Sequence, residues 1–380
     1  MLRRPTDLSR LLSLIAISSI SLAISAIACN SADLKGPSSS GSSGTTSGDP
    51  VDPSDPDAGA TDGGRDPGAD LDGGTLPLSS NVSIQVLPSD SGAAILAAIR
   101  GAKTSVHMTM YLLSNNQIID ALGDLKDAGK DVKVILNKTF PPNGGNNTSA
   151  FNALTSRGVP VVYAPAAYQF THAKTVIIDG ASMLVMTMNL TFSSPNDNRE
   201  FIATDRDPTD VADAEKIFAA DFDGKAVSVN GKLVVSPKAA TPIEPRSRLK
   251  ALIDSAKTSL DVEVQALSDD GLTDAIVAAH NDKVAVRVVL SGGNEDTPAE
   301  AESIAKLKAA GVPLRLVTTP YIHAKAIVAD GTKVFVGSQN FTPTALVYNR
   351  EIGVMTDSAA EAKKVTDTIA KDFAAGTPAP

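Results

Sequence analysis

The sequence has one cysteine, no tryptophan and few other aromatic residues, and each shortage excludes a class of structure or site. Cys29 has no partner in the chain, so an intramolecular disulfide is excluded and the fold must rest on packing alone. With aromatic residues at 4% of the chain, a set of rings for stacking nucleic-acid bases is poorly supplied. Basic charge is not in excess either, because the formal net charge is −9. A surface dedicated to duplex DNA is therefore not expected.

The negative charge is concentrated close to the N-terminus. Between Asp49 and Asp72 there are eight Asp residues, opposed only by Arg65. Residues 29–80 consist mainly of Ser, Gly, Asp, Pro and Thr, a composition that buries too little apolar surface to fold. We therefore expect residues 29–80 to form a flexible acidic linker.

The first 28 residues have the layout of an export signal. Basic residues within the first ten positions precede an apolar run from Leu11 to Ile27, which is typical of a signal peptide. The run ends in Ala26-Ile27-Ala28-Cys29, which resembles a bacterial lipobox. We predict a signal peptide over residues 1–28 and lipidation at Cys29. This places the exported protein in the cell envelope on an N-terminal lipid anchor, with simple secretion as the alternative.

Strand and helix patterns alternate from residue 81 onward. The predicted strands of the first half are Val82–Leu87, Thr104–Leu112, Asp131–Asn137 and Val159–Tyr163, and the predicted helices are Ser91–Gly101, Asn116–Ala128 and Ser149–Arg157. Such alternation predicts an α/β fold with a largely parallel sheet covered by helices on both faces.

The second half repeats the order of the first. Ala102-Lys103-Thr104-Ser105, for example, returns as Ala256-Lys257-Thr258-Ser259. Two copies, each long enough for its own core, indicate a duplicated domain rather than a solenoid. We predict one domain over residues 81–230 and a second over residues 231–380, related by pseudo-two-fold symmetry.

One pattern of polar residues occurs twice, 151 residues apart. Each copy reads His-x-Lys-x4-Asp-Gly, then has an Asn 17 residues after the His and a Glu 28 residues after it. The polar residues are His172, Lys174, Asp179, Asn189 and Glu200 in the first copy and His323, Lys325, Asp330, Asn340 and Glu351 in the second. Polar groups at fixed offsets in two copies point to a two-fold site.

Each Asp-Gly pair predicts a hairpin turn within its copy. A two-residue loop would set His172 opposite Thr187. It would likewise set His323 opposite Ser338. A four-residue loop would set each His opposite the Asn of its copy. The two loops differ in register by an even number of residues, so the His, Lys, hydroxyl and Asn side chains share one face of the hairpin in both cases. Four polar groups on one face of an apolar hairpin are costly to bury unless they serve a site.

This set of side chains suits an anionic phosphoryl centre. Lys supplies charge, Asn and the hydroxyl supply hydrogen-bond donors, and His serves as nucleophile, base or acid near neutral pH. Phosphoryl transfer through a covalent intermediate needs one His to attack and another group to protonate the leaving oxygen. Two copies that face each other would supply both, so we predict a monomer with both half-sites in one chain.

At this point the sequence resembles the phospholipase D superfamily, whose signature is His-x-Lys-x4-Asp-x6-Gly-Ser-x-Asn. The second copy matches it throughout, with Gly337-Ser338 in the Gly-Ser positions. The first copy has Met186-Thr187 there, which keeps a hydroxyl. We expect Met186 to narrow that side of the pocket. The resemblance covers residues 81–372 and implies two α-β-α sandwich domains with mixed, largely parallel sheets.

The resemblance also implies a two-step reaction through a phosphohistidine, without metal or cofactor. By analogy His172 is the nucleophile and His323 the general acid/base, and the better match of the second copy leaves the reverse assignment open. The residues implied to hold phosphoryl oxygens are Lys174, Lys325, Asn189 and Asn340. Glu200 and Glu351 are implied to orient the two imidazoles.

Further polar residues have two interpretations each. Thr187, Ser338, Tyr111 and Gln265 are candidates for binding substrate, with core or rim packing as the alternative for the last two. Asp179 and Asp330 are expected to serve the turn or the scaffold. Arg199 and Arg350 either bind substrate or form buried ion pairs. His107 is expected to be structural and His280 inert, and residues 143–147 are expected to form a loop.

The expected activity is that of a phospholipase D-like phosphodiesterase or phosphatidyltransferase acting on phospholipids. A nuclease and a cardiolipin-synthase-like transferase use the same motif and remain alternatives. A nucleic-acid substrate is disfavoured by the lack of a basic surface. An envelope protein that binds phosphate head groups without catalysis is the alternative from a different class.

Overall fold

The computed structural model describes residues 76–140, 145–237, 240, 244–292 and 298–380. The predicted signal peptide, Cys29 and the linker up to residue 75 lie outside the described residues, as do Asn143 and Gly144 of the expected loop. Among the helices that are described, none is long and apolar enough to cross a membrane.

The first unit follows the predicted alternation and then continues into the repeated hairpin. Its elements are β1 (Val82–Leu87), α1 (Ala93–Arg100), β2 (Ser105–Met110), α2 (Asn116–Asp127), β3 (Asp131–Leu136), β4 (Thr139–Phe140), β5 (Gly145–Asn146), α3 (Thr148–Ser156), β6 (Val161–Tyr163), β7 (Lys174–Ile178), β8 (Ser182–Met186), α4 (Ser194–Asp197), β9 (Asn198–Asp205) and α5 (Pro208–Phe222).

The second unit repeats this order. Its elements are β10 (Val234–Ser236), α6 (Pro245–Asp254), β11 (Ser259–Val264), α7 (Asp270–Asn281), β12 (Ala285–Ser291), α8 (Pro298–Ala309), β13 (Leu314–Val317), β14 (Tyr321–Ile322), β15 (Lys325–Ala329), β16 (Lys333–Gly337), the π-helix η2 (Thr344–Tyr348), β17 (Glu351–Thr356), α9 (Ala359–Ala375) and β18 (Thr377–Pro378).

Helix ends fall where the polar and glycine residues predict them. The side chain of Asn115 accepts hydrogen bonds from the backbone N–H groups of Gln117 and Ile118 and so caps the start of α2. Gly129, just after α2, has a φ of 76°, a left-handed conformation that is costly for other residues and ends the helix. Local chemistry therefore sets where α2 begins and ends.

Each unit is built on a mixed sheet, as expected, but parallel pairing does not dominate. The first sheet has the order β1-β9-β8-β7-β2-β3-β6, and the second has β10-β17-β16-β15-β11-β12-β13-β18. Along these two paths the parallel pairs are those of β2–β3–β6 and of β11–β12–β13, and the short β14 also pairs parallel with β9. The expectation of largely parallel sheets is therefore wrong, because each hairpin inserts antiparallel beside β2 or β11 and brings β9 or β17 with it.

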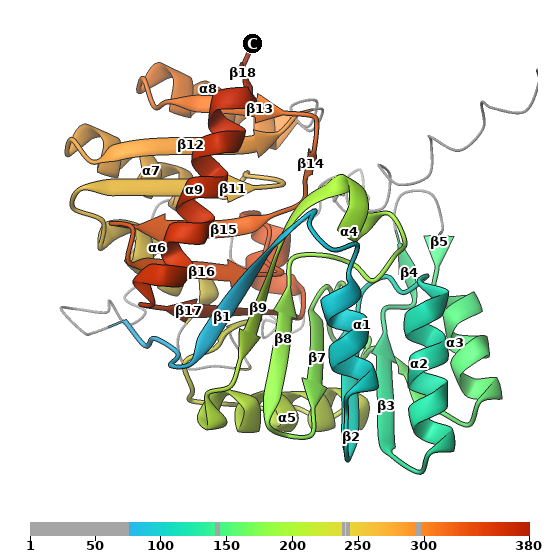
Figure 1. Cartoon of the computed structure of the whole chain (residues 1–380). Coiled ribbons are helices and arrows are strands. Elements are labelled where there is room, and N and C mark those ends of the chain that lie inside the picture. The colour runs from blue at the N-terminus through green and yellow to red at the C-terminus, as the bar shows by residue number, and fades with distance from the viewer. Residues whose placement is uncertain (1–75, 141–144, 238–239, 241–243, 293–297) are drawn as a thin grey trace, which may run out of the picture.

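The two units stand side by side (Figure 1). They share a central core. Helices α1 to α3 cover the outer face of the first sheet, and α6 to α8 cover the outer face of the second. Side chains of the inner faces pack with α5 and α9 into one apolar cluster that contains residues of both units. Strands β16 and β17 contact β7, β8 and β9, so the two hairpins meet at the junction.

Residues 76–80 belong to the fold rather than to the linker in which we expected them. Leu76 and Leu78 pack against the core of the second unit. The N–H of Ser79 donates a 2.7 Å hydrogen bond to the carbonyl of Met355, and the hydroxyl of Ser80 donates one of 2.7 Å to Asp207. The apolar residues in this short stretch supply the burial that the acidic segment before it lacks.

The hairpin turns are one residue longer than a two-residue loop. Ile178 pairs with Ser182, and Ala329 pairs with Lys333, so three residues form each turn. Asp179 has a φ of 57° and Gly180 a φ of 58°, the left-handed values that an Asp-Gly turn adopts. A turn of three residues shifts the pairing by one residue relative to either loop considered above. The hydroxyl residue and Asn therefore fall on the opposite face of the continued ladder from His and Lys, and the predicted common face is wrong.

Candidate active site

Each motif histidine is hydrogen-bonded through its backbone to the Asn-Arg-Glu triplet of the other unit. The N–H of His172 donates to the carbonyl of Arg350 at 2.9 Å. The N–H of His323 donates to the carbonyl of Arg199 at 3.2 Å, next to the short parallel pairing of β14 with β9. The residues just before β7 and β15 are therefore held in place by the opposite unit.

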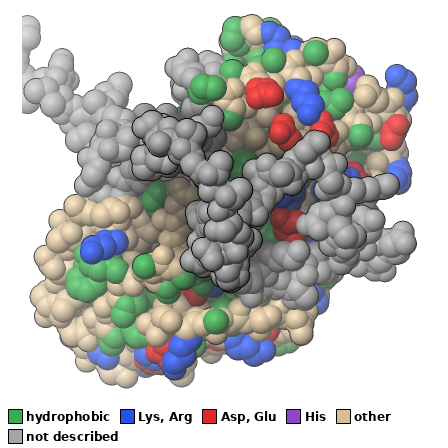
Figure 2. All heavy atoms as spheres, turned by 180° about the vertical axis from the view of Figure 1, so that it is seen from behind, with side chains coloured by type: hydrophobic (Ala, Val, Ile, Leu, Met, Phe, Trp, Pro, Cys, Tyr) green, Lys and Arg blue, Asp and Glu red, His purple; other side chains and the backbone are tan. Residues whose placement is uncertain are grey.

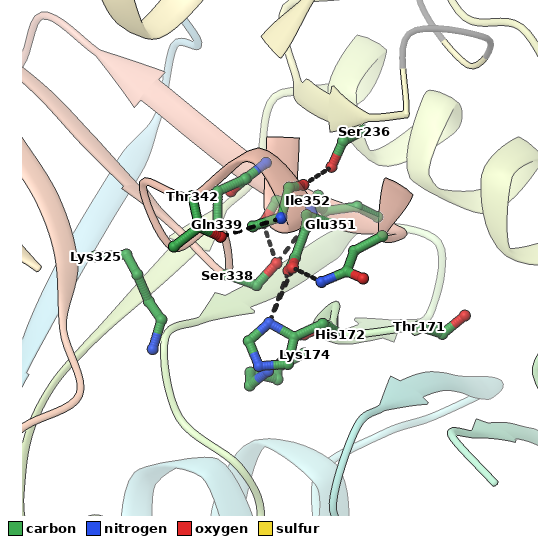
Figure 3. A network of polar contacts seen from close by, with 12 residues as sticks. Thr171, His172, Lys174, Ser236, Lys325, Ser338, Gln339, Thr342, Glu351 and Ile352 are labelled. Atoms are coloured by element: carbon green, nitrogen blue, oxygen red, sulfur yellow. Dashed lines mark hydrogen bonds and ion pairs between the residues drawn. The ribbon is translucent and has the colours of Figure 1, made fainter. Parts of the chain in front are cut away.

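The histidine side chains also contact residues of the opposite unit. Nδ1 of His172 lies 3.0 Å from both carboxylate oxygens of Glu351, toward which its ring is directed (Figure 3). Nδ1 of His323 lies 2.8 Å from Oε1 of Glu200. Both carboxylates are fully buried. Each glutamate thus orients the imidazole of the other repeat, which joins the two motifs into one site.

The two motif lysines are also fully buried beside the histidines. Nζ of Lys174 donates a 2.5 Å hydrogen bond to the carbonyl of His172 and lies 5.0 Å from the centre of the Tyr111 ring. Nζ of Lys325 donates to the carbonyl of His323 at 2.7 Å and to Oε1 of Gln265 at 3.0 Å. These contacts hold both ammonium groups next to the imidazoles.

Glu200 also accepts hydrogen bonds from two side chains of its own unit. It accepts a 2.5 Å hydrogen bond from the hydroxyl of Thr187 and a 3.1 Å bond from Nδ2 of Asn198. Burial raises the pKa of Glu200 to about 7, although Lys325, the two hydrogen bonds and Lys174 all act to lower it. Because the lysines of both motifs act on one carboxylate, the two half-sites converge.

The charges of the site suit a phosphodiester. With both glutamates ionised, the two lysines balance them, and one protonated imidazole leaves a net charge of +1. Buried charges persist only when they are paired or serve a ligand, and a phosphodiester monoanion completes the balance. Asn189 and Asn340 are buried just beyond the ends of β8 and β16 and add amide groups at the same edge of each sheet.

Comparison with known families identifies this arrangement. The family model described as the PLD-like domain of cardiolipin synthase matches residues 95–222 and, a second time, residues 249–374. The chain belongs to the phospholipase D superfamily. Each matched segment contains one His-x-Lys motif together with the glutamate that orients the other histidine.

Similar proteins include enzymes of this superfamily. A mitochondrial cardiolipin hydrolase of Xenopus tropicalis is 38% identical over 112 residues, which are 29% of this chain and 52% of that protein. A phospholipase D of Rickettsia prowazekii is 32% identical over 100 residues, which are 26% of this chain and 48% of that protein. This phospholipase D-superfamily chain therefore spans about half the length of the curated relatives it matches.

Two solved structures share the fold. The phosphatidylserine synthase of Haemophilus influenzae superposes with a TM-score of 0.57 at 12% identity, over 79% of this chain and 87% of that chain. The polyphosphate kinase of Porphyromonas gingivalis superposes with a TM-score of 0.56 at 16% identity, over 77% and 47% of the two chains. At these identities the likeness concerns the fold alone.

The motif aspartates are structural, as the sequence indicated. Asp179 accepts hydrogen bonds of 2.6 to 3.0 Å from the backbone N–H groups of residues 103–105 and one of 2.9 Å from the hydroxyl of Thr104. Burial alone would raise the pKa of Asp179, but these bonds lower it to about 2. Asp330 makes the equivalent contacts with residues 257–259. Both carboxylates tie the hairpin turn to the start of β2 or β11.

The four predicted substrate-binding residues contact the site's own side chains or the backbone. Tyr111 packs its ring edge-on against His172, with centroids 4.6 Å apart, and Gln265 holds Lys325 and is fully buried. The hydroxyl of Thr187 is used on Glu200, and that of Ser338 donates to the carbonyl of Ile352 at 3.3 Å. Tyr111, Gln265 and Thr187 thus contact His172, Lys325 and Glu200, whereas Ser338 contacts the backbone, and direct contact of these four residues with substrate stays a prediction.

The side chain of Met186 is buried in the outer apolar cluster of the first unit, together with Met188 and Ile202. Thr187, the next residue, turns to Glu200. Because Thr175 pairs with Val185 and successive side chains of a strand alternate between the two faces of a sheet, Met186 lies on the same face as Lys174. That Met186 narrows the pocket stays a prediction.

Both motif arginines form buried ion pairs across the units. The guanidinium of Arg199 donates to Asp372 at 2.5 and 3.1 Å. That of Arg350 donates to Asp221 at 2.8 and 2.9 Å and also contacts the hydroxyl of Tyr168. Of the two interpretations that the sequence left open, the ion pair is confirmed.

The two remaining histidines lie outside the site. His107 of β2 lies between Glu215 at 2.7 Å and Asp131 at 3.2 Å and stacks on Phe218, as expected for a structural residue. His280 lies in the last turn of α7, in the outer layer of the second unit. Within the described ranges, no group of three or more His, Cys, Asp or Glu residues is arranged to hold a metal ion.

Sequence reasoning missed several residues that the structure brings to the site or its supports. Asp221 and Asp372 stand at the same offset of 151 residues as the motifs, each followed by Phe, so the repeat itself could have revealed them. Asn198 supports Glu200, and Asn349 donates to Glu351 at 3.0 Å. Tyr321, whose hydroxyl accepts from Nε2 of Gln265 at 3.0 Å, stands at the same offset from Phe170, which packs edge-on against Tyr111.

Proposed function

We propose that this protein is a phosphodiesterase or phosphatidyltransferase that acts on phospholipids through a phosphohistidine. The observation that carries the proposal is the pair of imidazoles whose Nδ1 atoms lie 2.8 and 3.0 Å from buried carboxylates. An imidazole that donates from Nδ1 carries its lone pair on Nε2, which suits it for attack or for proton transfer. Two such groups in one site supply both steps of a double displacement.

In the first step, the lone pair on Nε2 of His172 forms a bond to phosphorus while the P–O bond to the leaving alcohol breaks. The leaving oxygen takes the proton from Nε2 of His323. In the second step, His323 takes a proton from water or an acceptor alcohol, whose oxygen attacks phosphorus. The P–N bond breaks and returns its electron pair to His172. The assignment of the two roles follows the family analogy, and the symmetric geometry is compatible with the reverse.

The charge that develops on the phosphoryl oxygens is met by fixed donors. Lys174 and Lys325 are buried and held by the carbonyls of the residues two positions before them, so their positions need little reorganisation during the reaction. Asn189 and Asn340 supply the amide donors. A preorganised positive site of this kind favours the transition state over the bound ground state.

Three observations favour phospholipids over nucleic acids. The matched relatives include proteins named cardiolipin hydrolase and phospholipase D. Among the described residues, the large hydrophobic side chains that are exposed are Phe192 and Tyr348, three residues from Asn189 and Glu351 respectively. Aromatic side chains at such positions suit the interface of a membrane. On the face shown in Figure 2, basic and acidic side chains alternate along the described surface, unlike a duplex-binding face.

We further propose that the protein is exported and held on a membrane by lipidation at Cys29. The support is the order of basic start, apolar run and small residues before the only cysteine of the chain. A phospholipid substrate and a membrane anchor fit one another, because the anchor keeps the enzyme at its substrate. Since one chain supplies both histidines, the protein is proposed to act as a monomer.

The test is to incubate the purified protein, in EDTA, with vesicles of cardiolipin and phosphatidylglycerol plus a primary alcohol, and separately with plasmid DNA. Release of head group or formation of phosphatidyl-alcohol is expected. It should fall by about 10²- to 10⁴-fold in His172→Ala and in His323→Ala. His280→Ala serves as the control histidine variant and should keep full activity.

Other outcomes each point elsewhere. Cleavage of DNA without turnover of lipid, weakening as salt rises, would replace the phospholipid proposal with a nuclease. Loss of activity in EDTA would contradict the mechanism through two histidines alone. Vesicle binding with no turnover of either substrate would favour a protein that only binds phosphate head groups.

A further inference from the structure

The two units differ at the hydroxyl residue that precedes each motif asparagine. In the first unit, the Thr187 hydroxyl oxygen accepts a 2.9 Å hydrogen bond from the N–H of Phe201 and lies 2.5 Å from Oε2 of Glu200. In the second, the Ser338 hydroxyl oxygen accepts a 3.1 Å bond from the N–H of Ile352 and contacts the carbonyl of the same residue at 3.3 Å. The backbone partners of the two hydroxyls are thus equivalent, and Thr187 adds a contact to a glutamate.

The direction of the Thr187 hydrogen bond follows from its surroundings. A hydroxyl has one proton, and its oxygen already accepts from the N–H of Phe201. The carbonyl of Phe201 lies 3.3 Å away, whereas the carboxylate oxygen of Glu200 lies at 2.5 Å. The shorter contact to a charged acceptor is the stronger one, so the proton of Thr187 goes to Glu200.

Glu200 consequently has three side-chain contacts of this kind, from Thr187, Asn198 and His323. Within the described part of the chain, Glu351 is held by His172 and Asn349, while Ser338 turns to the backbone. Thr187 contacts Oε2 of Glu200, whereas Asn198 and His323 contact Oε1. In Glu351 the His172 ring itself contacts both oxygens. The two halves of the site therefore differ in what holds the second oxygen of each glutamate.

The extra donor acts on a carboxylate that is otherwise hard to keep ionised. Glu200 is fully buried, and burial raises its pKa to about 7 even with Lys325, Thr187 and Asn198 acting against the rise. Removing the hydroxyl would raise the pKa further, so that more of Glu200 is protonated at neutral pH. A protonated glutamate holds the Nδ1–H of the His323 imidazole more weakly.

We propose that Thr187 is a positioning residue, whose hydroxyl keeps Glu200 ionised and aimed at His323. Thr187 never touches the phosphoryl group in this role and acts through the other two residues. The hydroxyl of the first unit thus gives its glutamate a contact that the hydroxyl of Ser338 does not give in the second. Where it concerns turnover, this inference rests on the proposed function.

The kinetic test compares Thr187→Ala with Ser338→Ala, a matched control that also leaves one backbone N–H without its hydroxyl acceptor. Thr187→Ala should lower kcat by about 10- to 100-fold on phospholipid vesicles. It should also move the acidic limb of the pH profile of kcat/KM to higher pH. Ser338→Ala should leave that limb in place, and Thr187→Ser should restore both kcat and the limb. An unmoved limb in Thr187→Ala, or an equal shift in Ser338→Ala, overturns the proposal.

A substrate-free test separates this inference from the proposed function. The His323 imidazole is titrated by NMR in the wild-type protein, in Thr187→Ala and in Thr187→Ser, each checked for folding by its thermal transition. Weakening of the carboxylate partner should lower the titration midpoint of His323 in Thr187→Ala, and Thr187→Ser should return it. An unchanged midpoint contradicts the positioning role. If the midpoint shifts while the wild-type protein turns over no phosphodiester, the proposed function fails and the positioning role stands.

Discussion

Met186 and Gly337 occupy equivalent positions on β8 and β16, but the space beside the backbone is filled differently in the two units. Met186 pairs with Ile202 on β9, and both fill the outer core. Gly337 pairs with Gly353, and a Cβ on Gly337 would lie 2.3 Å from Oε1 of Gln339. The second unit therefore needs glycine because a buried glutamine side chain occupies the space that methionine fills in the first.

The first prediction concerns this residue. Met186→Ala should lower the free energy of unfolding by about 2–5 kcal/mol, because it leaves a cavity in the outer core. Activity per folded molecule should stay within about threefold of the wild type, since the side chain packs in the outer apolar cluster. Denaturant unfolding and assays on vesicles measure the two effects. Met186→Leu conserves volume and should cost less than about 1.5 kcal/mol. A rise in activity without loss of stability would instead support a pocket narrowed by Met186.

At the scale of elements, the junction between β9 and α5 concentrates acidic side chains. Asp207 caps α5 by accepting the N–H of Thr209 at 3.0 Å, and Asp205 accepts the N–H of Asp207 at 2.8 Å. Burial raises the pKa of Asp205 to about 7, and the charges of Asp210 and Asp207 add to the rise. The junction therefore carries a carboxyl group that is costly to ionise in the folded protein.

This predicts a stability that depends on pH. The folded protein keeps the Asp205 proton up to about pH 7, whereas an unfolded Asp loses it near about 3.9, so stability is lost as pH rises between these values. Asp205→Asn keeps an acceptor for Asp207 and removes the titration. It should stabilise the protein by roughly 1–4 kcal/mol at pH 8 and by much less at pH 5.

Thermal unfolding of Asp205→Asn at the two pH values gives the comparison. Asp197→Asn, at an exposed position at the end of α4, is the control and should change stability little at either pH. Equal gains of Asp205→Asn at pH 5 and pH 8 would contradict the assignment of the titration to Asp205.

At the scale of the molecule, the site exists only where the two units meet. Four buried contacts join a basic side chain of one unit to a carboxylate of the other, namely His172–Glu351, His323–Glu200, Arg199–Asp372 and Arg350–Asp221. Because the carbonyls of Arg199 and Arg350 also accept the N–H groups of the histidines, the arginine pairs and the imidazoles form one support.

A third prediction follows for the arginine pairs. Arg350→Met should destabilise the protein by about 3–5 kcal/mol, because Asp221 is left as an uncompensated buried charge. Activity should fall more than unfolding explains, since the backbone of residue 350 holds His172. Adding Asp221→Leu to Arg350→Met should recover part of the stability. Calorimetry and vesicle assays on the single and double variants provide the measurements.

The matched control is Arg157→Met, because Arg157 pairs with the exposed residues Asp124 and Asp127 at the surface. Exposed pairs contribute about 0–1 kcal/mol, so this variant should remain close to the wild type. A similar cost in Arg157→Met and Arg350→Met would mean that the buried pair has no special role between the units.

Local pattern was sufficient for many elements of the first unit. The helix predicted over Asn116–Ala128 is observed over Asn116–Asp127, because its asparagine cap and terminal glycine act within a few residues. Local pattern did not predict how the strands pair. Alternation of strands and helices favours parallel pairing, but it does not show that β7 inserts antiparallel beside β2. The turn of three residues likewise decided which residues of β8 lie opposite those of β7, and local pattern did not predict it.

By itself, the sequence determined the duplication, the family and the identity of the motif residues, since repeated spacing survives without coordinates. The tertiary structure decided which glutamate orients which histidine and which carboxylate receives the hydroxyl of Thr187. The contact between His172 and Glu351 joins residues 179 apart in the chain. The spacing within each copy does not show whether a histidine is oriented by the glutamate of its own copy or by the glutamate of the other copy. Only the packing of one unit on the other brings the opposite pair within hydrogen-bonding distance.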